Sequence, residues 1–144
     1  MKSVRLKNSV LTAFGSTRRA GIKASDDQNL KDLIESQTKT ITIFGKSWDM
    51  HVKEVFKTEL EENIRMIHDS VKYLKSKNKK VIYDAEHFFD GYAHNSAYAL
   101  KTIQTALEAG ASVLVLCDTN GGSLPSTIYK IVSEIKATLA FPLG

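Results

Sequence analysis

The sequence predicts an α/β protein made of consecutive parallel β/α units. Four short runs of apolar, β-branched residues recur along the chain, and helical patterns lie between them. None of the runs alternates polar with apolar residues, which is typical of strands covered on both faces of a parallel sheet. The regular β-α order favours a parallel architecture with short connections. The expected strands are residues 10–14, 40–44, 81–85 and 112–117.

The expected helices follow from apolar residues that recur three and four positions apart. The clearest begins near Thr58, where Thr58 and Glu61 match a capping box, and its apolar residues form one stripe that suits a helix lying on a sheet. Pro125 suits the first position of the last helix, and Gly110 suits a left-handed stop after the helix before it. The other helices are expected over residues 27–36 and 96–109 and from residue 125 onward.

Length and composition limit the function classes. The 144 residues suit one domain, and we expect residues 1–144 to form a single domain of about four β/α units. The net charge of +4 is dispersed apart from a lysine cluster around Asn78, which is interpreted as a solvated face and not as a nucleic-acid site. A single cysteine, Cys117, excludes an internal disulfide, and no apolar stretch reaches the length of a membrane span. We therefore expect a cytoplasmic protein that binds neither nucleic acid nor membrane.

Polar residues follow each predicted strand at its carboxyl end, which is where parallel α/β folds bind their ligands. Asp84 and Glu86 lie two residues apart on the third strand, so their side chains point to the same side. Two carboxylates on one face of an apolar strand are costly unless they hold a metal, bind a substrate hydroxyl or act as a base. A salt bridge to Lys46 or Arg18 is the structural alternative.

The fourth strand leads into a glycine-rich turn, Asp118-Thr119-Asn120-Gly121-Gly122. This segment matches neither the dinucleotide-binding pattern nor the P-loop, so it does not predict a nucleotide site. Its glycines permit a tight turn, which leaves the Thr119 hydroxyl and nearby backbone N–H groups available to an anion.

The four junctions between strand and loop carry long, ordered motifs. They read AFGSTRR at residues 13–19, TIFGKSWD at 42–49, VIYDAEHFFDGY at 81–92 and LCDTNGG at 116–122. These motifs resemble the family of citramalate, isopropylmalate and homocitrate synthases, which is related to the HMG-CoA lyase-type barrels. The resemblance covers essentially the whole chain. It implies a fragment of a (β/α)₈ barrel, from about its third to its sixth strand.

The same resemblance implies a reaction and roles for four residues. The reaction is a Claisen-type condensation of acetyl-CoA with a small 2-oxo acid, which is pyruvate in the citramalate-forming members and another oxo acid in the isopropylmalate and homocitrate synthases. Glu86 matches a glutamate implicated in the proton chemistry. Asp84 matches a position that lines the oxo-acid site, and Thr119 a threonine whose hydroxyl holds the oxo-acid carboxylate. Phe44 matches an apolar position that shapes the pocket for the substrate's short tail.

Two features of the family are missing from the sequence. The Arg-Asp pair of the first strand and the His-x-His motif of the seventh strand are absent. The resemblance implies that a divalent metal polarises the oxo acid in the parent enzyme, but the ligands of that metal are absent from this chain. We therefore expect no metal site in the chain and no activity from the chain alone.

A self-contained doubly wound domain of flavodoxin or receiver type, acting as a binding module, is the alternative that length and strand count leave open. Against it, residues 15–18 make a poor phosphate loop, and no acidic pair follows the first strand. The barrel predicts strands in sequential order with helices on one face, whereas the flavodoxin order places the first strand between others. A partial barrel also leaves two strand edges and one sheet face open, which predicts self-association.

Overall fold

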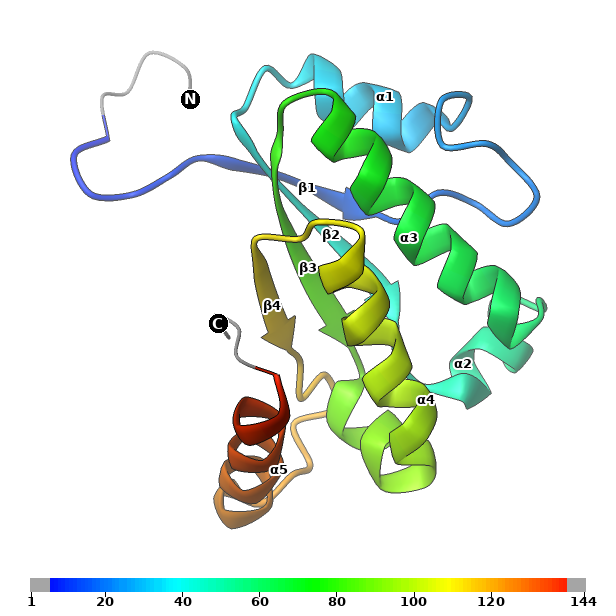
Figure 1. The fold of residues 1–144 in the computed structure, drawn as a ribbon, viewed down its shortest axis with the longest axis vertical. Helices are drawn as coiled ribbons and strands as arrows, with labels where there is room; N and C mark the ends of the chain where they lie inside the picture. Colours follow the sequence, from blue (N-terminus) through cyan, green and yellow to red (C-terminus); the bar gives the residue numbers. More distant parts are fainter. Residues whose placement is uncertain (1–5, 140–144) are drawn as a thin grey trace.

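Residues 6–139 of the chain are described by a computed structural model, in which four parallel strands form one sheet. The strands pair in the sequential order β1-β2-β3-β4 (Figure 1). Their bounds are β1 Thr12–Ser16, β2 Thr40–Lys46, β3 Lys80–Glu86 and β4 Val113–Leu116. The sequential order confirms the prediction of consecutive parallel β/α units. The flavodoxin-like alternative is wrong, because β1 lies at an edge of the sheet and not between other strands.

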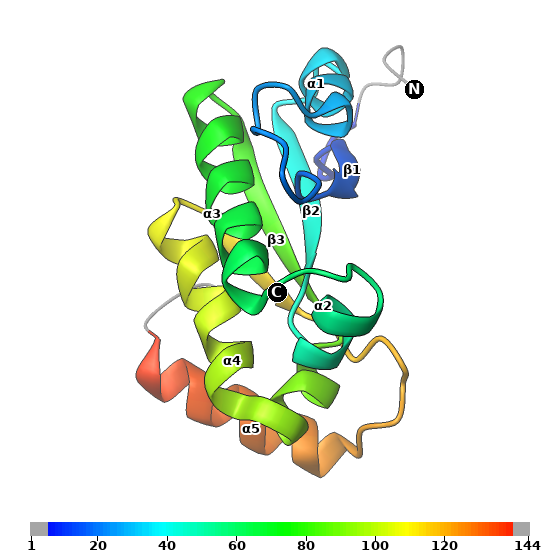
Figure 2. The ribbon, with the colours of Figure 1, turned by 90° about the vertical axis from the view of Figure 1, so that its right-hand side faces the viewer.

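The helices lie along one side of the sheet and beyond its carboxyl end (Figures 1 and 2). Three of them, α1, α3 and α4, pack against strands, and α5 lies beside α4, where Tyr92 of α4 donates a hydrogen bond to Glu134 of α5. The short α2 follows β2 directly. The bounds are α1 Gln28–Glu35, α2 Asp49–Glu54, α3 Leu60–Ser76, α4 Phe88–Glu108 and α5 Pro125–Thr138. Within residues 6–139, no helix is both long and apolar enough to cross a membrane.

The alternation of side chains along the strands gives the sheet two unlike faces. Ile41, Ile43, Tyr83 and Leu114 are fully buried in the core between the sheet and the helices. On the other face, Phe14 is 62% exposed. Thr40 and Thr42 of β2, on the same face as Phe14, are buried. Within residues 6–139, the cover that the sequence predicts on both faces is therefore complete on the helix side and partial on the other.

Several predicted boundaries are corrected by the structure. The first strand begins at Thr12 and not at residue 10, because its pairing with β2 runs from Thr12 opposite Thr40 to Ser16 opposite Phe44. The predicted capping box at Thr58 is wrong, since α3 begins at Leu60 and makes no side-chain cap hydrogen bond. The helix predicted over residues 96–109 begins eight residues earlier, and the break at Asn95 explains the difference.

Other local signals are confirmed. The helix expected over residues 27–36 is α1, and its cap Asp27 accepts a hydrogen bond of 3.1 Å from the backbone N–H of Leu30. Pro125 is the first residue of α5, and Gly110 adopts a φ of 104° directly after the end of α4. The helix α2 was not among the expected elements.

Gly91 marks a close approach between α4 and the loop that follows β2. A Cβ at this position would meet the Ser47 carbonyl oxygen and lie 2.9 Å from the Ser47 carbonyl carbon, and both are backbone atoms. We expect Gly91→Ala to lower the free energy of unfolding by about 1–3 kcal/mol, as overpacking does, and to lower the urea midpoint. In the control Gly122→Ala the new Cβ meets nothing within 4 Å, so the change should stay below about 0.5 kcal/mol. Equal midpoints for the two variants would contradict the prediction.

Candidate functional site

The parallel register places the polar ends of three strands in two rows at the carboxyl edge of the sheet. Ser16, Phe44 and Asp84 lie opposite one another on β1, β2 and β3. Lys46 and Glu86 form the next row, at the last paired position of β2 and β3. In Figure 1 the arrowheads of β2, β3 and β4 point toward the end of the molecule that also carries α2. Three of the four residues predicted from the sequence thus lie at the same edge.

Asp84 and Glu86 point to the same face, as predicted, but their surroundings differ. Glu86 Oε2 lies 2.5 Å from Lys46 Nζ, and the two side chains are 25% and 12% exposed. The Asp84 carboxylate has no hydrogen-bond or ion-pair partner in residues 6–139, and its partial burial raises its pKa. The structural alternative is therefore correct for Glu86 and Lys46. It is wrong for Arg18, whose partners are Glu62 and Asp69.

The Cys117 thiol lies close to these two carboxylates. Burial raises its pKa to about 11, and the negative charges of Asp84 and Glu86 act in the same direction. A thiol with this pKa is protonated at neutral pH and is a poor nucleophile. Cys117 is therefore no candidate for covalent catalysis.

Thr119 reaches the end of β3 through the glycine-rich turn. The turn closes with a hydrogen bond of 2.9 Å from the Gly121 N–H to the Asp118 carbonyl oxygen, and Gly121 adopts a φ of 65°. The Thr119 hydroxyl accepts a hydrogen bond of 2.9 Å from the backbone N–H of His87, the residue after Glu86. This contact joins the loop after β4 to the end of β3, and it leaves the hydroxyl proton of Thr119 available to a ligand.

Phe44 borders a cavity of about 350 Å³ at the carboxyl ends of β1 and β2. Its ring stacks on that of Phe14, with 5.7 Å between the ring centroids. The cavity lies between the loop of residues 17–20 and the connection from α2 to α3, which contributes Val55 and Phe56. Phe44 thus forms an apolar wall of this cavity.

Trp48, His51 and His87 form a ring cluster that the sequence did not reveal. The ring centroids of His51 and His87 are 4.3 Å apart, and those of Trp48 and His51 are 4.7 Å apart. Trp48 Nε1 and His51 Nδ1 are buried without a hydrogen-bond partner in the described residues. Burial lowers the pKa of His51, and His87 and Lys46 act in the same direction, so this imidazole is neutral at neutral pH. His51 lies in α2, and the path of the chain after β2 brings it against His87. The spacing of the two histidines in the sequence therefore does not predict that they meet.

Arg18 fixes the loop that borders the cavity. Its guanidinium group forms ion pairs of 2.7 Å with Glu62 and 2.9 Å with Asp69, and its own side chain is 5% exposed. Its backbone N–H donates a hydrogen bond of 2.8 Å to Ser70 on α3. Burial by itself raises the pKa of Glu62, but hydrogen bonds from Arg18, the Gly21 N–H and Arg65 outweigh burial and lower it to about 2.

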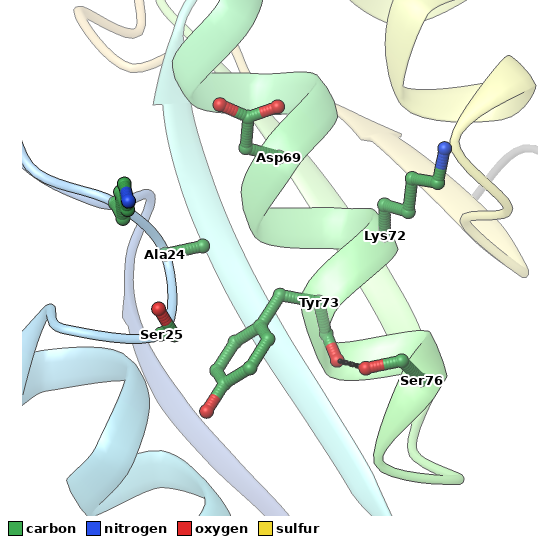
Figure 3. A pocket seen from close by; sticks show the side chains of 7 residues that line it. Ala24, Ser25, Asp69, Lys72, Tyr73 and Ser76 are labelled. Carbon is green, nitrogen blue, oxygen red and sulfur yellow. Dashed lines mark hydrogen bonds between the residues drawn. The ribbon is translucent and has the colours of Figure 1, made fainter.

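A second cavity, of about 380 Å³, lies between the β1–α1 loop and α3. The Tyr73 ring projects from α3 toward Ala24 and Ser25 of that loop, and Ser76 donates a hydrogen bond to the Tyr73 carbonyl oxygen (Figure 3). None of the four predicted site residues lines this cavity.

A metal does not fit the side chains in the described part of the chain. No group of three or more His, Cys, Asp or Glu residues between residues 6 and 139 could hold a metal ion. Of the two carboxylates at the edge of the sheet, Glu86 is already paired with the Lys46 ammonium group, and a second cation beside that ammonium would be repelled. We therefore assign no metal ligand to these residues.

Comparison with known proteins identifies relatives over almost the whole chain. The HMGL-like family model matches residues 6–143. The (R)-citramalate synthase of Aquifex aeolicus is 54% identical over 135 residues, which are 94% of this chain and 26% of that protein. The 2-isopropylmalate synthase of Sulfolobus acidocaldarius is 31% identical over 115 residues, which are 80% of this chain and 29% of that protein. The chain thus spans little more than a quarter of the length of these relatives.

Among solved structures, the HMG-CoA lyase of Bacillus subtilis superposes with a TM-score of 0.75 over 94% of this chain and 43% of that chain. Its sequence identity is 14%, so this likeness concerns the fold alone. It agrees with the sequential parallel sheet, and the described β/α units are part of a (β/α)₈-barrel fold.

The low pKa of Glu62 predicts how stability depends on pH. A carboxyl whose pKa falls from 4.5 to about 2 on folding contributes about 3 kcal/mol above pH 5, and this contribution is lost as the pH falls toward 2. We expect Glu62→Gln to be about 3 kcal/mol less stable than the parent at pH 7, with a difference that shrinks from pH 5 toward pH 2. Urea unfolding across this range measures it. Glu61→Gln, which removes an exposed partner of Lys101, is the control and should leave the urea midpoint unchanged.

Proposed function

This chain belongs to the HMGL-like family, and we propose that it forms part of a transferase that condenses acetyl-CoA with pyruvate to give citramalate and free CoA. The similarity to (R)-citramalate synthase, at 54% identity over 94% of the chain, supports this reaction over that of 2-isopropylmalate synthase, at 31% over 80%. Such an enzyme would act in the cytoplasm, in branched-chain amino-acid biosynthesis.

The observation that carries the proposal is the position of Glu86 at the carboxyl edge of the sheet. Its Oε2 is bound by Lys46, whereas its Oε1 accepts no hydrogen bond from residues 6–139. In the proposed reaction Oε1 removes a proton from the methyl group of acetyl-CoA. The electron pair left on the methyl carbon attacks the oxo carbon of pyruvate and forms the new C–C bond, while the π pair of the C=O bond moves to the oxygen, which takes up a proton from water and becomes the hydroxyl group. Water then cleaves the thioester and releases CoA, and Glu86 returns its proton to the solvent.

The other residues at this edge are proposed to bind the oxo acid. The Thr119 hydroxyl, which keeps its own proton while it accepts from the His87 N–H, would donate a hydrogen bond to the pyruvate carboxylate. Burial raises the pKa of Asp84, which favours the neutral form that can donate to an oxo-acid oxygen. Phe44 would pack against the methyl group of pyruvate from the wall of the 350 Å³ cavity.

A divalent metal would make the oxo carbon a better electrophile. Because the residues described here supply no set of metal ligands, the proposal assigns none of them to the metal and routes no step through it. The roles of Glu86, Thr119, Asp84 and Phe44 do not depend on which residues would hold that ion.

The proposal predicts how the longer enzyme that carries this segment responds to loss of the base. Glu86→Gln should lower kcat by roughly 10² to 10⁴, because the amide cannot take up the methyl proton. Thr119→Ala should mainly raise the KM for pyruvate, because it removes a binding contact. Release of CoA, measured with a thiol reagent at varied pyruvate, separates the two effects. Near-normal turnover of Glu86→Gln would remove Glu86 from the mechanism, and a preference for a larger oxo acid would exclude pyruvate as the substrate.

We further propose that the 144-residue chain associates with itself when it stands alone. Phe14 on the edge strand β1 is 62% exposed, and Val10, just before this strand, is 72% exposed. Within residues 6–139, β1 and β4 each leave one edge without a partner strand. Open strand edges and an uncovered apolar face both favour pairing with another chain.

Sedimentation velocity at micromolar concentration should therefore show a species larger than 16.0 kDa that dissociates on dilution. Phe14→Lys should shift the equilibrium toward the monomer, because a charge on the open face opposes its burial. Gly122→Ala, in an open loop, is the control. A monomer at every concentration would contradict the proposal.

A further inference from the structure

Lys46 and Glu86 stand opposite each other at the last paired position of β2 and β3. Because side chains alternate along a strand, both lie on the same face as Phe44 and Asp84, which occupy the preceding row. The Lys46 Nζ atom is 2.5 Å from Glu86 Oε2. The side chains are only 12% and 25% exposed, and a charge-assisted hydrogen bond in such a site is stronger than one at the open surface.

Lys46 is also held by contacts that do not involve Glu86. Its Nζ lies 6.0 Å from the centroid of the Phe44 ring and 5.7 Å from that of Phe56, within the range of cation–π attraction. Its carbonyl oxygen accepts a hydrogen bond of 2.9 Å from the side chain of Asn63, which is fully buried in α3. The ammonium group therefore has its own fixed position, and this position determines where Glu86 Oε2 lies.

We propose that Lys46 is a positioning residue for the reaction, one that anchors Oε2 of Glu86 and leaves Oε1 free to act as the base. This inference rests on the proposed function. A hydrogen bond to one oxygen stops the carboxylate from rotating, which keeps the other oxygen aimed at the substrate.

The proposed proton transfer involves only the acetyl methyl group and Glu86, and Lys46 takes no part in it chemically. The C–H bond of the acetyl methyl group breaks, its electron pair stays on carbon as the enolate, and the proton forms a new O–H bond at Oε1. Glu86 becomes neutral, while Lys46 keeps its proton and its charge throughout. Lys46 thus acts through Glu86 and touches neither substrate.

Four variants of the longer enzyme test this role: Lys46→Met, Lys46→Arg, Glu86→Gln and the double variant of Lys46→Met with Glu86→Gln. Lys46→Met should lower kcat by about 10²-fold, the usual cost of a misplaced catalytic group, with little change in the KM for pyruvate. Lys46→Arg keeps a charged hydrogen-bond donor for Oε2 and should restore most of the turnover.

The double variant tests whether the two residues act as a unit. In the Glu86→Gln background, Lys46→Met should lower kcat no further, because the group that Lys46 positions is already absent. The matched control is Lys101→Met, which breaks the exposed ion pair with Glu61 and should leave kcat unchanged.

Two results would overturn the inference while the proposed function stands. One is parent-like turnover of Lys46→Met alongside an inactive Glu86→Gln. The other is a loss of turnover that follows a lower melting temperature and is not restored by Lys46→Arg, which would make the pair purely structural. Near-normal turnover of Glu86→Gln would overturn both the role of Glu86 and this inference. An active Lys46→Met therefore contradicts only the role of Lys46, whereas an active Glu86→Gln contradicts the proposed mechanism as well.

Discussion

Backbone pairing in a parallel sheet forces the side chains of neighbouring strands to stand in rows, and this constraint positions the candidate site. The row of Ser16, Phe44 and Asp84 and the row of Lys46 and Glu86 exist only in the register that the three strands adopt. A shift of β2 by one residue would turn Lys46 toward the helices and Ile43 toward the open face. Because Ile41 and Ile43 are fully buried in the core, the core fixes the register and thereby pairs the charged groups.

The partly buried charged side chains differ in how fully neighbouring groups compensate their charge. Arg18 is surrounded by two carboxylates and a loop that it ties to α3, so its burial is offset by ion pairs and hydrogen bonds. Glu86 is bound through one oxygen only, and Asp84 has no partner among the residues between 6 and 139. Incomplete compensation of this kind at the carboxyl edge of a parallel sheet is typical of a functional site.

The fold could be predicted from the sequence because its signals are local. The apolar runs, the helix pattern of residues 27–36 and the helix start at Pro125 each act on their own segment of chain, and the structure confirms them. The boundaries that were wrong depend on contacts between distant segments. The strand β1 begins at Thr12 because its partner β2 begins at Thr40. The helix that starts at Phe88 is broken at Asn95, where the side chain donates a hydrogen bond to Asp49, the first residue of α2.

The candidate site, too, could be predicted from the sequence only where its features are local. The sequence by itself determined that Asp84 and Glu86 share one face, because a strand alternates its side chains with a period of two. Only the tertiary structure decided that Lys46 and not Arg18 is the partner of Glu86, that Thr119 meets the His87 N–H, and that His51 lies against His87. These contacts join residues 32 to 40 positions apart, as in the pairs of His87 with Thr119 and Lys46 with Glu86. Separations of this length are closed by strand register and loop path, which no local pattern in the sequence encodes.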